Sequence, residues 1–172
     1  MIVIRLSKEQ EAEALRIFNV SKGTLYSEDA CFTGEDLNMF VGQLGEQAVR
    51  YWFDTMGIKY ETDPTPYAIG LVDKFDLLVR ELKIDVKTRN QPNYTRLLEK
   101  KRIVDSDKVK DVYISAKLMT IRSPYEVGIV GWVYGGDFKL IGKEEDLGYG
   151  KPTYCIFDEQ LRSLEELLFI LQ

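Results

Sequence analysis

Residues 75–88 have the sequence FDLLVRELKIDVKT, and they decide the fold that we expect for this chain. Two short runs, 75–79 and 82–88, alternate between apolar and polar side chains, which predicts two strands joined into a hairpin. Successive side chains of a strand point to opposite faces of its sheet. The charged side chains of the second strand, among them Asp85 and Lys87, therefore share one face, and its apolar side chains share the other.

The register of this hairpin decides whether its two acids meet. If residues 80–81 form a two-residue turn, Asp76 lies directly opposite Asp85, and directly opposed residues have Cβ atoms about 4.5–5.5 Å apart. Two carboxylates that close repel each other unless a positive group lies between them, which a divalent cation and the ammonium of Lys87 would provide. The turn sequence Arg-Glu fits short hairpins poorly. A slip by two residues would separate the acids, and a slip by one would place them on opposite faces.

The strongest helix of the sequence precedes the hairpin, at residues 35–56. It carries apolar stripes on two sides, which predicts a helix packed between a sheet and another helix. Glu46 lies beside the second stripe, close to Gly42 and Gly45. Because glycine weakens a helix, we expect these glycines to permit the close approach of a neighbouring element.

The remaining segments complete a single domain over residues 1–172. Further helices are expected at residues 7–19, 94–104 and 161–171, and further strands at 112–118 and 127–134. Ser7 is the expected N-cap of the first helix, and Trp132 is expected in the core. Helices before, between and after the strands predict an α/β fold, with a central mixed sheet of four to five strands and helices on both sides.

The composition excludes several kinds of chemistry. The chain contains no histidine, which removes Ser-His and Cys-His catalysis and histidine-ligated zinc. Two distant cysteines, Cys31 and Cys155, do not suit a zinc site; free thiols in a reducing cytoplasm are expected, with one disulfide as the alternative. No apolar run is long enough to span a membrane, and we expect no secretory signal, because charged residues interrupt the first segment too early. Catalysis would therefore need carboxylates, lysine and a hard cation such as Mg²⁺.

Basic residues gather in one part of an acidic chain. The formal net charge is −5, yet residues 80–110 contain ten basic and five acidic side chains. A local basic region on an acidic body suits an enzyme that meets phosphate at one place. The candidate phosphate contacts are Arg89, Lys100, Lys101 and Arg102. The alternative for 100–102 is an ordinary solvated helix, and Tyr94 could stack on a base or belong to the core.

Three motifs together resemble the PD-(D/E)XK, or restriction-endonuclease-like, nuclease superfamily: GE at 45–46 on a long helix, DLLV at 76–79 in the hairpin, and IDVKT at 84–88 on the next strand. That superfamily places an acid on a helix, a second acid at the start of a hairpin, and an acid-X-Lys triplet on the following strand. The resemblance covers residues 35–88 in order and spacing. Phe75 stands where a proline often precedes the hairpin acid, and Asp73 is an alternative to Asp76 in that role.

The resemblance implies a role for each matching residue. Asp76 and Asp85 would be the principal Mg²⁺ ligands, with Mn²⁺ as a substitute, helped by the backbone carbonyl of Val86. Glu46 would complete the site directly or through water. Lys87 would orient or activate the attacking water and stabilise charge on the phosphate. The partner would be DNA, the mode of cleavage endonucleolytic, and a homodimer is compatible with cutting both strands.

Two other functions compete with this expectation. The first is a noncatalytic nucleic-acid-binding protein that keeps the nuclease fold. The second is a structural or interaction protein in which the Asp-X-Lys triplet of residues 85–87 is accidental. Alanine substitution of the two hairpin acids distinguishes an active site from an accidental triplet. In an active site the crowded acids destabilise the metal-free protein, so their removal should raise its stability, whereas in an accidental triplet stability should be unchanged or lower.

Overall fold

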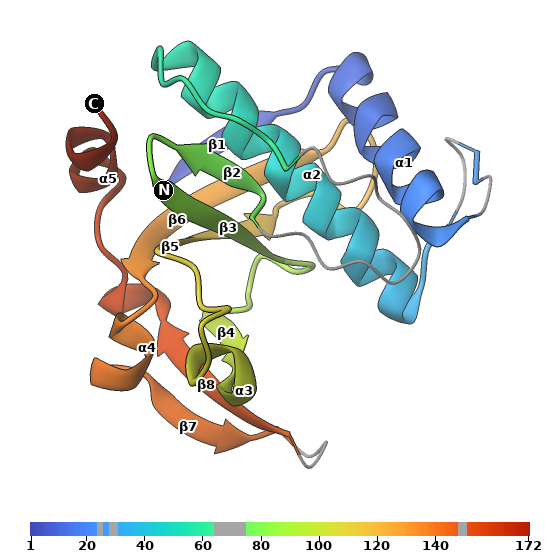
Figure 1. Cartoon of the computed structure of the whole chain (residues 1–172). Coiled ribbons are helices and arrows are strands. Elements are labelled where there is room, and N and C mark those ends of the chain that lie inside the picture. Colours follow the sequence, from blue (N-terminus) through green and yellow to red (C-terminus); the bar gives the residue numbers. More distant parts are fainter. Residues whose placement is uncertain (24–25, 28–30, 64–74, 148–150) are drawn as a thin grey trace.

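The structure, a computed structural model, describes residues 1–23, 26–27, 31–63, 75–147 and 151–172 (Figure 1). Its elements in chain order are β1 (Ile2–Arg5), α1 (Lys8–Lys22), α2 (Gly34–Thr55), β2 (Leu77–Val79), β3 (Leu82–Arg89), β4 (Arg96–Lys100), α3 (Lys101–Val104), β5 (Val112–Leu118), β6 (Glu126–Tyr134), α4 (Asp137–Leu140), β7 (Lys143–Asp146), β8 (Pro152–Phe157), the 3₁₀ helix η1 (Asp158–Gln160) and α5 (Leu164–Leu171). Within the described residues, no helix is long and apolar enough to cross a membrane.

Five strands form the central sheet, in the order β1-β6-β5-β3-β2. β3 and β5 are parallel, and the other neighbouring pairs are antiparallel. The sheet is therefore mixed, as the sequence predicts. The edge strand β1 was not predicted, because its four residues show no clear alternation of apolar and polar side chains.

Helices α1 and α2 cover one face of this sheet (Figure 1). Ser7 caps α1 as predicted, and it forms a capping box with Gln10. Both apolar stripes of α2 are buried, with Trp52 from one and Phe53 from the other at 1% and 0% exposure. α2 contacts α1 on one side and β3 on the other, which confirms that it is sandwiched.

A second, three-stranded sheet in the order β4-β8-β7 lies against the opposite face. A small core joins the two layers: Tyr113 and Val133 of the central sheet pack with Leu97 and Ile156 of the second sheet and with Phe138 of α4. This face is thus covered by a small sheet together with the short helices α3 and α4, and not by long helices as on the other face.

The helix predicted at residues 94–104 is wrong for most of its length. Arg96–Lys100 is strand β4, and only Lys101–Val104 is helical. Leu97 and Glu99 are buried while Leu98 is exposed, which is strand alternation. β4 owes its conformation to antiparallel pairing with β8, a strand more than 50 residues later that the sequence did not reveal.

The remaining expectations need smaller changes. The C-terminal helix begins at Leu164, after its N-cap Ser163, and not at residue 161. Trp132 is buried as expected, and its Nε1 donates to the Ser163 carbonyl at 2.8 Å. Cys31 and Cys155 are both free thiols, so the alternative of a disulfide is wrong.

Candidate active site at the edge of the central sheet

The hairpin has the register that brings its acids together. Leu78 pairs with Lys83 and Val79 with Leu82, so the connection is the two-residue turn at 80–81. Arg80 takes a positive φ of 56°, which explains how a turn without glycine closes. The apolar side chains of β3 face α2, and its charged side chains face the second sheet.

Asp76 lies just before β2, beside the part of β3 that extends beyond its pairing with β2. Its backbone N–H donates to the Ile84 carbonyl at 3.0 Å, but the strand register ends at the pair Leu77–Ile84, so Asp76 precedes β2 and is not paired directly opposite Asp85 as predicted. Its Oδ2 accepts a 2.6 Å hydrogen bond from the Val86 backbone N–H. Because β2 ends here, the Asp76 carboxylate takes the place of a strand partner for Val86.

Negative charges from both faces of the sheet converge on Asp76. Burial, then the charge of Glu46, then the charge of Asp85 raise the pKa of Asp76 well above its usual range. The Val86 hydrogen bond and Lys87 oppose this shift only in part. Asp76 is therefore an acid whose charged form needs a cation that the described residues do not fully supply.

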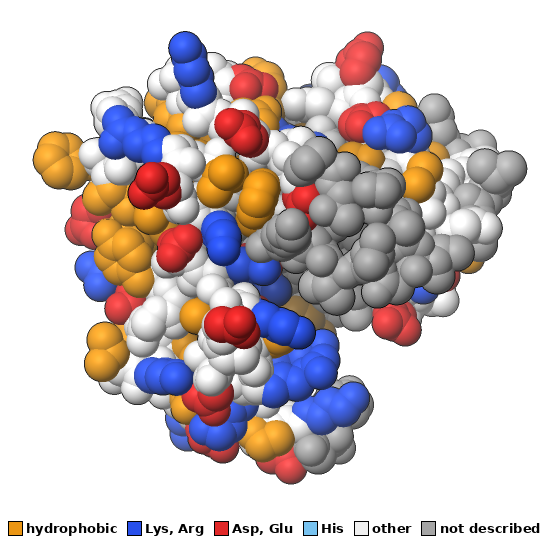
Figure 2. Space-filling view, in the orientation of Figure 1, with side chains coloured by type: hydrophobic (Ala, Val, Ile, Leu, Met, Phe, Trp, Pro, Cys, Tyr) orange, Lys and Arg blue, Asp and Glu red, His pale blue; other side chains and the backbone are white. Residues whose placement is uncertain are grey.

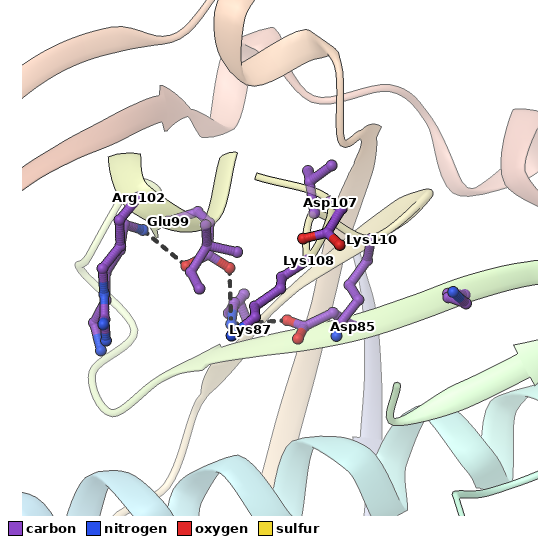
Figure 3. Close-up of a pocket in the computed structure, with 11 residues that line it drawn as sticks. Asp85, Lys87, Glu99, Arg102, Asp107, Lys108 and Lys110 are labelled. Carbon is purple, nitrogen blue, oxygen red and sulfur yellow. Dashed lines mark hydrogen bonds and ion pairs between the residues drawn. The ribbon is translucent and has the colours of Figure 1, made fainter. Parts of the chain in front are cut away.

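Lys87 lies between two carboxylates (Figure 3). Its Nζ is 2.9 Å from Asp85 Oδ2 and 3.2 Å from Glu99 Oε2. Burial lowers the pKa of Lys87, but attraction to Asp85 and Glu99 outweighs burial and holds that pKa above its usual range. Lys87 is thus a charged hydrogen-bond donor at neutral pH, 5.8 Å from the centre of the Tyr113 ring.

Glu99 is the site residue that the sequence did not reveal. It lies on β4 in the second sheet, is 7% exposed, and also accepts from the Lys100 backbone N–H at 2.7 Å. The only signal was the alternation of residues 97–99, which becomes visible once the segment is treated as a strand. The site therefore includes a carboxylate from each of the two layers.

Gly45 brings α2 close to β3. A Cβ atom at Gly45 would lie 1.7 Å from Thr88 Oγ1 and 2.8 Å from Thr88 Cβ, so only glycine fits. This confirms the expected close approach at Gly45, whereas Gly42 has open space around it. The neighbouring Glu46 is buried and turned along its own helix, accepting from Gln43 at 2.9 Å and from Arg50 at 3.0 Å.

The four candidate phosphate contacts divide into two groups. Arg89 pairs with Asp158 at 2.7 Å and also donates to Ser115 and to the Tyr94 carbonyl. Lys101 pairs with Asp105 and Glu144, so both side chains are engaged in contacts within the chain. Lys100 and Arg102 instead line a pocket beside Lys87. Tyr94 is exposed, so it does not belong to the core, and it does not line that pocket.

The carboxylate oxygens of Asp76 and Asp85 fit a hard cation such as Mg²⁺, but they do not form a complete set of ligands. Within the described residues, no group of three or more Asp, Glu, Cys or His side chains is close enough to hold a metal ion. Asp85 Oδ2 is nevertheless buried and lacks a well-aligned hydrogen bond; its 2.9 Å contact with Lys87 is an ion pair of poor hydrogen-bond geometry. Asp85 and Asp76 repel each other and offer carboxylate oxygens, which are ligands that Mg²⁺ prefers. The alternative ligand Asp73 lies outside the described residues.

Comparison of the chain with protein-family models, with curated proteins and with solved structures gives no match.

Proposed function

We propose that this chain is a metal-dependent deoxyribonuclease of the PD-(D/E)XK type, which hydrolyses DNA phosphodiesters at the edge of its central sheet. One observation carries the proposal: Asp76, Asp85 and Lys87 adjoin one another around a single strand, with Asp76 bonded to the Val86 amide and Lys87 paired with Asp85. The spacing of these three residues in the sequence also predicts that they belong to one site. The restriction-endonuclease-like fold is part of the same proposal.

The crowded carboxylates support the choice of a divalent cation. Asp76, Asp85 and the Val86 carbonyl would hold Mg²⁺ or Mn²⁺, with Glu46 contributing after it leaves Arg50 or through water. The cation, when bound, lowers the pKa of water and neutralises charge that develops at phosphorus.

Lys87 would act as a cation and not as a base. Its ammonium is held between Asp85 and Glu99, so it can donate a hydrogen bond to the attacked phosphate or orient water against it. Glu99 would act through Lys87 as a positioning residue. No covalent intermediate is needed, because water attacks phosphorus directly.

The test is cleavage of supercoiled, linear and branched DNA in Mg²⁺, Mn²⁺ or EDTA. We expect metal-dependent cutting by the wild type, including nicking of closed circles, because the proposed mode is endonucleolytic. Asp85→Asn and Lys87→Ala should each reduce cutting by at least about 100-fold, the usual effect of removing one transition-state contact. Glu13→Gln, which loses only an exposed ion pair with Arg16 on α1, is the matched control. Cutting that survives in both site variants would overturn the assignment.

The noncatalytic DNA-binding protein is the second candidate. It is favoured by the engagement of Glu46 with Arg50 and Gln43, together with the lack of a three-carboxylate group among the described residues. This candidate predicts DNA binding and no cutting of any substrate in either metal, with Mn²⁺ leaving the melting temperature unchanged.

A further inference from the structure

A basic pocket opens next to Lys87, outside the proposed metal-binding acids. Its volume is about 510 Å³, and it lies between β3, α3 and the segment that leads into β5 (Figure 3). Three carboxylates line it, and two of them, Asp85 and Glu99, are paired with Lys87. Its six cationic side chains are Lys83, Lys87, Lys100, Arg102, Lys108 and Lys110.

Five of these six cations are uncompensated. Apart from Lys87, none of them forms a side-chain ion pair or hydrogen bond with any residue that the structure describes. Other basic residues of the second layer behave differently: Lys101, Lys139 and Lys143 are all paired with acids. The pocket therefore carries an excess of unneutralised positive charge, which favours an anionic ligand.

The basic surface continues beyond this pocket. A second hollow of about 360 Å³ shares Lys100 and Arg102 with the first and extends to Lys151 at the start of β8. Figure 2 shows Lys and Arg side chains gathered around the region that α3 occupies in Figure 1. We name these two neighbouring hollows together the basic channel, defined by Lys83, Lys100, Arg102, Lys108, Lys110 and Lys151.

We infer that the basic channel binds the sugar-phosphate backbone of single-stranded DNA next to the cleaved bond. This inference rests on the proposed function and specifies its substrate as DNA with a single-stranded part. The channel is a row of hollows, each in the size range of small-ligand pockets, and such hollows admit one strand. A duplex presents its phosphates on a convex surface whose major groove alone is about 12 Å wide. Ile103 and Val109 supply apolar wall for sugars and bases between the cations.

The test measures binding without cleavage. Fluorescence anisotropy with a labelled oligothymidylate in EDTA compares the wild type with Lys108→Ala/Lys110→Ala and with Arg102→Ala. We expect the double variant to bind about tenfold more weakly, and its slope of log K against log salt to fall by about 0.7 for each lost phosphate contact. Lys59→Ala, which removes an exposed lysine far from the channel in sequence, should bind like the wild type. Melting curves verify that each variant is folded.

The outcomes separate this inference from the proposed function. Unchanged binding by folded channel variants would overturn the inference, as would a blunt duplex that competes as well as a single strand of equal length. Tight, channel-dependent binding with no cutting in Mg²⁺ or Mn²⁺ would overturn the nuclease and leave the channel standing. Cutting that is equal in wild type and channel variants would overturn the channel alone.

Discussion

Asp76 is a site residue whose ionised form lowers the stability of the folded chain. Burial and the charges of Glu46 and Asp85 raise its pKa, so ionised Asp76 destabilises the metal-free folded chain. The folded pKa lies above the unfolded value of about 3.9. The stability linked to protonated Asp76 is therefore present at acid pH and is lost as pH rises through the folded pKa.

We predict that Asp76→Asn stabilises the metal-free protein at pH 7 by about 0.5–2 kcal/mol. Asparagine has no charge to repel Asp85, and its oxygen can still accept from the Val86 N–H. The measurement is thermal unfolding in EDTA between pH 4 and pH 8, where the gain should shrink toward the acid end. Asp107→Asn, at an exposed acid, is the control. A variant less stable than wild type at pH 7 would show that Asp76 is a structural acid.

Glu99 and Lys87 test whether the second layer contributes to the site. Glu99→Gln keeps the shape but removes a charge 3.2 Å from Lys87 Nζ. We predict a stability loss of about 1 kcal/mol, small because Lys87 is partly exposed and solvent screens the pair. Cutting should fall through kcat with little change in the Mg²⁺ requirement. An altered metal requirement with unchanged kcat at saturating Mg²⁺ would instead make Glu99 a metal ligand.

At the scale of elements, one glycine sets the distance between α2 and β3. We predict that Gly45→Ala costs about 1–3 kcal/mol, because its Cβ would meet Thr88 within 1.7 Å and β-branched Thr88 cannot easily turn away. Gly42→Ala on the same helix should instead stabilise by about 0.5–1 kcal/mol, because no atom lies within 4 Å. Urea unfolding of both variants is the measurement.

A partner substitution tests the cause of the Gly45 effect. Thr88→Ala removes Oγ1 and Cγ2 but leaves the Cβ of residue 88, which lies 2.8 Å from the Cβ added at Gly45. The second substitution should therefore recover only part of the stability that Gly45→Ala loses. No restoration at all would place the strain elsewhere in the helix.

Local patterns were enough for the elements that carry the proposed acids. The hairpin alternation predicted the strands β2 and β3 but left their register open, and the structure selects the register with the two-residue turn. The two apolar stripes predicted the sandwiched α2. Local patterns failed at β4, because its conformation comes from pairing with β8, which no local pattern predicts. The error on β4 also hid Glu99, whose burial follows from strand alternation. Arg89 was offered as a phosphate contact because sequence cannot show that Asp158 lies beside it.

At the scale of the whole molecule, a buried ion network joins the two layers. Asp158 follows β8 of the small sheet and pairs with Arg89 of β3 at 2.7 Å and Lys117 of β5 at 3.1 Å. The two cationic side chains are only 10% and 11% exposed. Arg89 also donates to Ser115, so the network fixes the small sheet, and with it Glu99, against the strand that carries Lys87.

We predict that Asp158→Asn destabilises the protein by about 3–5 kcal/mol, because removing one partner leaves two buried cations short of a negative charge. Asp105→Asn is the matched control: it also contacts two lysines, but its side chain is 40% exposed, so its loss should have little effect on stability. Urea unfolding at neutral pH, followed by tryptophan fluorescence, gives both free energies. Equal losses for the two variants would mean that solvent reaches Arg89 and Lys117 in solution, and that the apolar contacts of Tyr113 and Val133 hold the layers together instead.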